Sequence, residues 1–172
     1  MRLRIALLLS LAASPALAVD MPPRKAGLWE LKMVFEGGAV PAQTFQHCID
    51  AATDKQMNTV GGGMRADQCA KQDIKQSGST LTIDSVCNFG AGNQTSRAVV
   101  TGDFNSAYTV KVNAKRDGPA VPGMPAETNM TMESKWLGPC KADQKPGDIV
   151  MGNGMKMNIN DLPKGMPPGM KK

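Results

Sequence analysis

Apolar and polar residues alternate along most of the chain, which is the pattern of half-buried β-strands. The clearest example places Tyr108, Val110 and Val112 opposite Thr109 and Lys111. Short segments of turn-forming residues, Ser77-Gly78-Ser79 and Asn105-Ser106, separate neighbouring strands and predict two hairpins. The pattern predicts seven strands, at residues 28–35, 43–49, 69–76, 80–87, 95–104, 108–115 and 128–137.

One segment, Asp50 to Met57, has the composition of a helix instead. Asp50 is a suitable N-cap, and the alanines that follow it favour helix. Seven short strands and one short helix predict a mainly β fold, either a small antiparallel β-sandwich or a half-open barrel.

The first residues have the features of a cleavable secretory signal. Arg2 and Arg4 precede the apolar run Ile5 to Ala13, and Ala16-Leu17-Ala18 is a small-x-small cleavage site. The apolar run is too short for a membrane-spanning helix. We therefore expect an exported, periplasmic protein that does not span the membrane after cleavage. The predicted organisation is a signal peptide (1–18), a flexible leader (19–26), a β-rich domain (27–144) and a flexible Met/Gly/Pro-rich tail (145–172).

Cleavage changes the composition of the folded protein. It leaves 172 − 18 = 154 residues and a net charge of 18 − 15 = +3, which is too small to indicate a nucleic-acid partner. Only 28 of these residues are Val, Ile, Leu, Phe, Trp or Tyr, so the hydrophobic core is small. Methionines and disulfides are expected to compensate for it.

The four cysteines, Cys48, Cys69, Cys87 and Cys140, predict two structural disulfides in an oxidising compartment. Three pairings are possible. Cys69 and Cys87 flank a predicted hairpin symmetrically, but a directly cross-strand disulfide requires unusual geometry. We therefore favour Cys48–Cys69 with Cys87–Cys140. No C-x-x-C motif is present, which argues against a redox role.

Two segments, Gly27-Leu28-Trp29-Glu30 and Gln46-His47-Cys48, resemble a family of exported Gram-negative proteins that is known only as a domain of unknown function. Cys69, Cys87 and Gly138-Pro139-Cys140 extend the resemblance, which covers about Pro22 to Cys140. It implies a periplasmic, β-rich domain with no assigned activity and supplies no catalytic residue.

No catalytic residue is predicted, and the protein is expected not to be an enzyme. His47 is the single histidine, and its neighbour Cys48 points to the opposite face of a strand, where we expect it to be disulfide-bonded. His47 is therefore expected to face solvent. Gly61-Gly62-Gly63 is followed by Met64-Arg65 rather than by Lys-Ser/Thr, so it is not a phosphate-binding loop.

The methionines are the one unusual chemical feature. Met151, Met155 and Met157 form an M-x3-M-x-M pattern, and Met166 and Met170 follow it. Thioether sulfur is a soft ligand that selects Cu(I), so the three residues are a candidate metal site. Met124, Met130 and Met132 are possible additions to it. The alternatives are that these side chains pack on the sheet or on a partner, or that they have no role.

The function expected from these features is a small, non-enzymatic binding or interaction module of the cell envelope. Its partner is either an envelope protein, paired through a strand edge, or an apolar ligand. No cofactor is expected, except Cu(I) in the alternative in which the methionine thioethers bind a metal.

Overall fold

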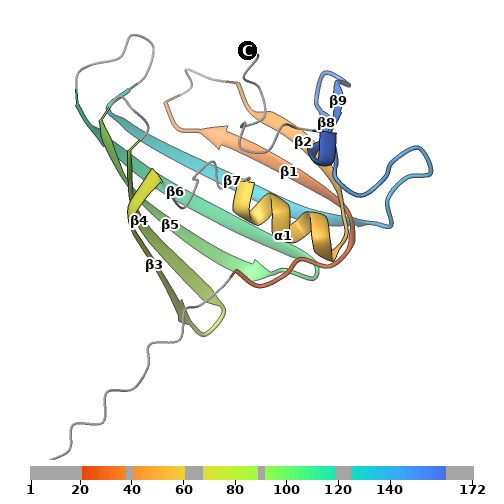
Figure 1. The fold of residues 1–172 in the computed structure, drawn as a ribbon, viewed down its shortest axis with the longest axis horizontal. Coiled ribbons are helices and arrows are strands. Elements are labelled where there is room, and N and C mark those ends of the chain that lie inside the picture. The colour runs from red at the N-terminus through yellow and green to blue at the C-terminus, as the bar shows by residue number, and fades with distance from the viewer. Residues whose placement is uncertain (1–20, 38–40, 61–67, 89–91, 119–124, 162–172) are drawn as a thin grey trace, which may run out of the picture.

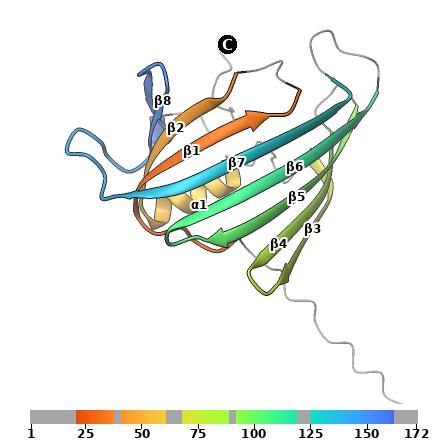
Figure 2. The ribbon, with the colours of Figure 1, turned by 180° about the vertical axis from the view of Figure 1, so that it is seen from behind.

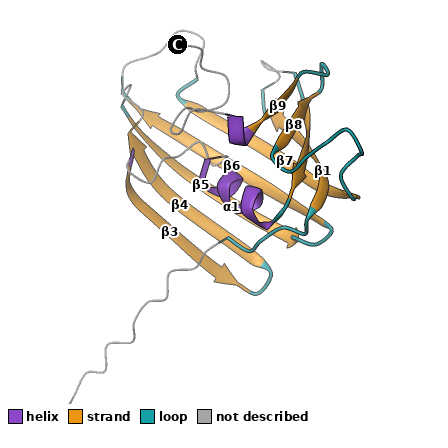
Figure 3. Ribbon diagram, turned by 45° about the vertical axis from the view of Figure 1, so that its right-hand side comes forward, coloured by secondary structure: helices purple, strands orange, loops and turns teal. Residues whose placement is uncertain are grey.

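The computed structural model describes residues 21–37, 41–60, 68–88, 92–118 and 125–161. These form a single antiparallel sheet that curves around one helix and does not close into a barrel (Figures 1 and 3). The strand order is β3-β4-β5-β6-β7-β1-β2-β8-β9. The predicted signal peptide, residues 1–18, lies outside the described residues.

The elements follow the sequence pattern closely. The strands are β1 (Gly27–Phe35), β2 (Gln43–Ile49), β3 (Cys69–Ser77), β4 (Thr80–Asn88), β5 (Asn93–Asp103), β6 (Ala107–Asp117), β7 (Glu127–Gly138), β8 (Asp148–Met151) and β9 (Lys156–Asn158). The helix α1 (Ala51–Val60) follows β2, and a short 3-10 helix, η2 (Ile159–Asp161), follows β9. All seven predicted strands and the helix are confirmed.

The half-open alternative is the one that the structure shows, because the described strands belong to one sheet rather than two. In Figure 1 α1 lies in front of the concave face of this sheet; Figure 2, seen from behind, shows the convex face, with α1 behind the strands. The helix thus covers the apolar face that a second sheet would cover in a sandwich. The largest completely buried apolar side chains, Trp29, Ile49 and Val100, point to this concave side.

The segments before β1 and after β7 are more ordered than the sequence suggests. The prediction of a flexible leader is wrong for its described part, because Arg24 is buried and Met21 packs against the core. The prediction of a flexible tail from Lys145 is wrong as far as residue 161, because β8 extends the sheet and Ile159 joins the core. Residues 162–172 lie outside the described part.

The favoured disulfide pairing is also wrong. The bonds are Cys69–Cys87 and Cys48–Cys140. Cys69 stands directly opposite Cys87 in the β3–β4 ladder, next to a register shift that interrupts the regular pairing. Cys48 and Cys140 meet because β2 and β7 both flank β1, where Leu28 pairs with Cys48 on one side and Gly138 on the other. The expectation that geometry disfavours a directly cross-strand disulfide is therefore wrong here, because Cys69 and Cys87 form such a bond.

Gly27, the first residue of the segment Gly27-Leu28-Trp29-Glu30, has a backbone conformation that favours glycine. Its φ is +129°, and a Cβ there would collide with the carbonyl group of Gly138 and with the indole nitrogen of Trp136. The backbone of β1 therefore approaches the end of β7 more closely than a side chain would allow.

Among the described helices, none is long and apolar enough to cross a membrane.

Candidate functional site: the concave face

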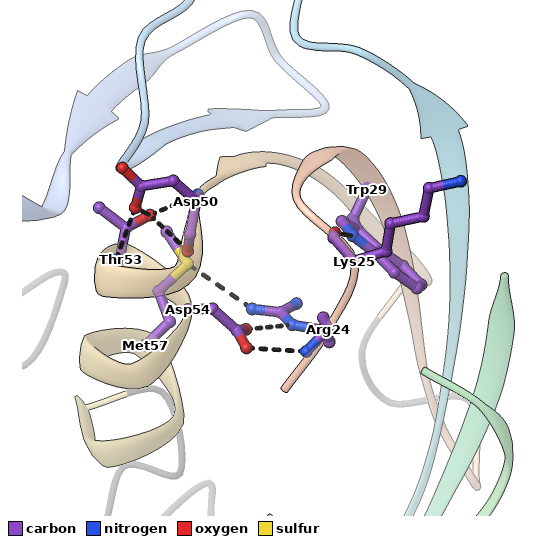
Figure 4. A network of polar contacts seen from close by, with 7 residues as sticks. All are labelled: Arg24, Lys25, Trp29, Asp50, Thr53, Asp54 and Met57. Atoms are coloured by element: carbon purple, nitrogen blue, oxygen red, sulfur yellow. Dashed lines mark hydrogen bonds and ion pairs between the residues drawn. The ribbon is translucent and has the colours of Figure 1, made fainter. Parts of the chain in front are cut away.

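The helix is fixed to the concave face by a buried ion pair. The Arg24 backbone N–H donates to Asp54 Oδ2 over 2.8 Å, and its side-chain Nε–H donates to Oδ1 over 2.7 Å (Figure 4). The two side chains are 5% and 1% exposed, so neither charge has water as an alternative partner. Removing one member leaves an uncompensated buried charge, which makes this pair a strong anchor for α1.

The first turn of α1 is capped as the sequence predicts. Asp50 Oδ1 accepts a hydrogen bond from the Thr53 N–H, and Thr53 Oγ1 accepts one from the Asp50 N–H. The hydrogen bonds that the Thr53 N–H and the Thr53 hydroxyl donate to the Asp50 carboxylate lower the pKa of Asp50. They satisfy a backbone donor in the first turn that has no partner within the helix.

Trp29 connects the segment before β1 to the core. Its indole N–H donates to the carbonyl oxygen of Lys25 over 2.7 Å, and the Arg24 guanidinium lies 6.0 Å from its ring centre. The Lys25 ammonium lies 3.6 Å from the centre of the Trp136 ring. One end of the concave face is thus closed by aromatic rings, the ion pair and the buried side chain of Met57.

A continuous row of apolar side chains crosses the concave face nearer the other end. Its members stand opposite one another in six consecutive strands, from β1 through β7, β6, β5 and β4 to β3. We name this row the apolar stripe; it consists of Phe35, Met130, Val112, Ala98, Ile83 and Ile74. All six are half-buried, whereas the core residues at the closed end are buried.

The stripe has the dimensions of an elongated binding surface. Five spacings between neighbouring strands, each about 4.8 Å, give it a length of about 24 Å. On the side away from the closed end it is followed by a polar row, in which Ser85 and Ser96 share a hydrogen bond of 2.7 Å. Both serines are buried, 2% and 8% exposed, so this flank of the stripe is dry.

The convex face has a different chemistry. Glu30 stands opposite Lys135, and Lys32 stands opposite Glu133. These four residues help to line a pocket of about 440 Å³. Because opposite charges alternate within it, these side chains give the pocket no excess charge that would select an ion.

His47 does not face solvent, contrary to the sequence-based expectation. It lies beside Trp29 and Ile149 in the neighbouring strands, and Ile149 packs against the core. Its Nδ1 is buried and has no hydrogen-bond partner among the described residues. Burial, followed by the charge of Arg24, lowers the pKa of His47 from 6.5 to about 4, so the ring is neutral at physiological pH.

Ser134 provides the second buried polar atom without a partner in the described part of the chain. Its Oγ lies on the concave side, where Ser134 stands between Leu31 and Tyr108. Both unpartnered atoms therefore belong to the concave face. An unsatisfied buried polar atom costs about 1–3 kcal/mol, so such atoms require an explanation.

The three candidate metal ligands lie in the β8–β9 hairpin rather than in a flexible segment. Ile149 stands opposite Met157, and the Met151 N–H donates to the Met155 carbonyl oxygen over 2.8 Å. This register places all three methionines at alternating positions on one face. Met130 and Met132 lie in β7, separated from β8 by β1 and β2, and Met124 lies outside the described residues.

The described ranges hold no group of three or more His, Cys, Asp or Glu able to bind a metal ion.

The two edges of the sheet do not favour pairing with another strand. The edge strand β3 carries Lys71 and Lys75, and the opposite edge strand, β9, has three residues. Charged or very short edges discourage strand addition.

Sequence reasoning missed Arg24, Asp54 and the apolar stripe. Arg24 was hidden because it follows two prolines, and Asp54 because an acidic residue in a first helical turn is common on protein surfaces. The apolar stripe was partly predictable from the sequence, since each of its members lies at an apolar position of a predicted strand. Their alignment depends on the register of six strands, which the pattern along a single strand does not contain.

A family model described as "Protein of unknown function (DUF3617)" matches residues 24–140. No curated protein and no solved structure matches the chain. The matched range begins at Arg24 of the buried ion pair and ends at Cys140 of the second disulfide. It thus includes α1 and the whole apolar stripe, but not the β8–β9 hairpin.

Proposed function

The chain belongs to the DUF3617 family, whose function is unknown, and we propose that it is an exported, non-enzymatic binding module that holds an elongated apolar ligand along the apolar stripe. The ligand lies across the strands on the concave face. The closed end of that face, with α1 anchored over it, provides the rigid scaffold.

The single observation that carries this proposal is the stripe itself. Six apolar residues from six consecutive strands form one uninterrupted row, and every one of them is half-buried. Four members, Val112, Ala98, Ile83 and Ile74, pack against the core cluster, but all six are more exposed than the closed end, where Trp29 is 0% exposed and Ile49 2%. Contiguous, partly exposed apolar surface is typical of ligand-binding grooves.

Export to the periplasm is supported by two features. The predicted signal peptide accounts for the N-terminal sequence, and both disulfides are compatible with an oxidising compartment. A non-enzymatic role is supported by the state of the two groups most suited to catalysis. The single histidine has a buried nitrogen with no hydrogen-bond partner among the described residues, and the four cysteines form two disulfides.

The proposal is tested by titrating the mature protein with N-phenyl-1-naphthylamine, an apolar dye whose fluorescence increases in a dry site. Met130→Gln keeps the length of the side chain but introduces a polar amide into the stripe. Thr131→Gln changes the adjacent residue, which points to the convex face. We expect Met130→Gln to weaken dye binding about tenfold or more, since an unpaired amide costs about 1–3 kcal/mol to bury. Equal affinities of the two variants would refute the proposal.

An alternative function is Cu(I) binding by methionine thioethers. The observation that favours it is the shared face of Met151, Met155 and Met157 on a short hairpin. None of the three belongs to the core cluster or to the side chains packed against it, although Ile149 between them does. Packing against the core therefore does not account for them. Substitution of all three by Leu is expected to abolish Cu(I) binding measured against a competing chelator.

A further inference from the structure

We infer that His47 is a fourth ligand of a soft-metal site whose other ligands are Met151, Met155 and Met157. This inference rests on the Cu(I) alternative above and deepens it. It adds an imidazole nitrogen from the main sheet to the thioethers of the hairpin. The ligand set would be three sulfurs and one nitrogen, which suits Cu(I), because thioether and imidazole are both ligands of that ion.

Strand register places Met151 at the centre of this set. Phe45 stands opposite Met151, and His47 stands opposite Ile149, so His47 and Met151 are diagonal neighbours across β2 and β8. Ile149 stands opposite Met157, so Met157 is the diagonal neighbour of Met151 on the other side. Diagonal neighbours are about 7–8 Å apart at Cα, a distance that long side chains can span.

Met155 completes the group at the tip of the hairpin. Its carbonyl oxygen accepts the Met151 N–H, which makes it the direct neighbour of Met151. Met155 is 54% exposed, so its thioether is accessible from solvent. Exposure at the tip gives an incoming ion access to the first thioether, and the long, flexible methionine side chains allow the others to converge.

The second observation that points to a ligand is the unpartnered nitrogen of His47. Nδ1 is buried and has no hydrogen-bond partner in the described part of the molecule, and the charge that acts on the imidazole is that of Arg24. Across the strands His47 has Trp29 on one side and Ile149 on the other, and neither of these side chains supplies an acceptor or a lone pair. A bound Cu(I) ion would give His47 Nδ1 the partner that it lacks among the described residues.

The test uses the mature protein under anaerobic conditions, with Cu(I) and a competing Cu(I) chelator. The variants are His47→Gln, His47→Asn and Met151→Leu, with Met33→Leu as the matched control. Met33 is a half-buried thioether on the same concave face, in β1, outside both the stripe and the hairpin. Leu for Met conserves volume, so the hairpin is expected to fold in each Met variant. X-ray absorption at the copper edge reports sulfur and nitrogen neighbours directly.

We expect His47→Gln and His47→Asn each to weaken Cu(I) binding about tenfold or more, by analogy with the loss of supporting groups at metal sites. Met151→Leu is expected to weaken it at least as much, and Met33→Leu to leave it unchanged. The absorption spectrum should contain one nitrogen neighbour that disappears in both His47 variants. A spectrum with sulfur neighbours alone, and His47 variants of unchanged affinity, would overturn the inference but leave thioether binding intact. Absence of saturable binding in the unsubstituted protein would overturn both.

Discussion

The two ends of the concave face differ in how they bury the same kind of residue. At the closed end, Trp29, Leu31 and Ile49 are buried beside α1, which the Arg24–Asp54 pair anchors. At the open end, the apolar stripe crosses six strands with every member half-buried. One sheet therefore has both a dry core and a partly exposed apolar surface, and the proposed binding role rests on the second.

Each end also has its own disulfide. Cys48–Cys140 joins the end of β2 to the residues after β7, next to the closed end, and Cys69–Cys87 joins β3 to β4 beyond the stripe. The closed end combines a disulfide with a packed core. The open end has its own disulfide, while its apolar stripe is half-buried.

The largest effect is expected from breaking the ion pair at the closed end. Asp54→Ala leaves the Arg24 guanidinium buried without its partner, which should reduce the free energy of unfolding by about 3–5 kcal/mol. Chemical denaturation measures this change. The control is Asp84→Ala, which removes an ion pair with Arg97 whose side chains are 38% and 65% exposed. That change should cost less than about 1 kcal/mol; equal losses would contradict the anchoring role.

Removing one disulfide at a time compares how much each crosslink stabilises its end of the concave face. The bonds close loops with sequence separations of 92 and 18 residues. The chain-entropy estimate for these loops is about 4.5 and about 3 kcal/mol, respectively. Replacing Cys48 and Cys140 together by Ala should therefore destabilise the protein more than replacing Cys69 and Cys87. Hydrogen exchange should show that loss of Cys69–Cys87 loosens mainly β3 and β4; uniform loosening would contradict the separation of the two ends.

A third prediction concerns pH and the β8–β9 hairpin, whose residue Asp148 is buried. Burial by itself raises the pKa of Asp148, but hydrogen bonds from the Asn158 side chain, the Lys145 N–H and Lys156 outweigh it and lower the pKa below its ordinary value. A lowered pKa contributes stability above the carboxyl's unfolded value of about 3.8, and this contribution is lost as the pH falls through the folded value.

Asp148→Asn should therefore lower the free energy of unfolding at pH 7 by about 1.5–3 kcal/mol, the value of hydrogen bonds to a charged group. The difference from the unsubstituted protein should shrink as the pH falls below about 4. Denaturation curves at several pH values measure it. A difference independent of pH would show that the charge of Asp148 does not contribute.

The smallest effect on stability is expected in the stripe. Met130→Gln should cost less than about 1 kcal/mol, because the side chain is half-buried and the amide can reach water. Met57→Gln at the closed end should cost about 2 kcal/mol or more, because Met57 is 6% exposed and the amide has no access to solvent. Thermal denaturation of the two variants under the same conditions measures both losses of stability. Similar losses would show that the stripe is part of the core.

The sequence predicts the elements well and their assembly poorly. Alternation located β1 to β7 because one side of each strand is apolar and the other polar, and Asp50 identified the start of α1. The hairpin β8–β9 was missed because it is rich in Gly, Asn and Met, and its buried members, Asp148 and Asn158, are polar residues that bond to each other over 2.7 Å.

The candidate sites show the same limit. Met151, Met155 and Met157 stood out by spacing and chemistry, but the position of His47 beside their hairpin depends on β8 pairing with β2. The pairing of Cys69 with Cys87 had a local signal in their symmetric positions about a predicted hairpin, whereas the pairing of Cys48 with Cys140 depends on β2 and β7 both flanking β1. Contacts between strands far apart in sequence carry this information, and a local pattern does not.

The most direct test of the central claim is to locate a bound apolar ligand on the protein. A long-chain amphiphile with a diazirine on its chain is bound to the mature protein, activated by light and mapped by mass spectrometry of the peptides. We predict labels at the stripe, on strands β1 and β3 to β7, that are suppressed by an excess of the unlabelled amphiphile and by Met130→Gln. Labels confined to convex-face residues, or equally strong in Met130→Gln, would contradict the account.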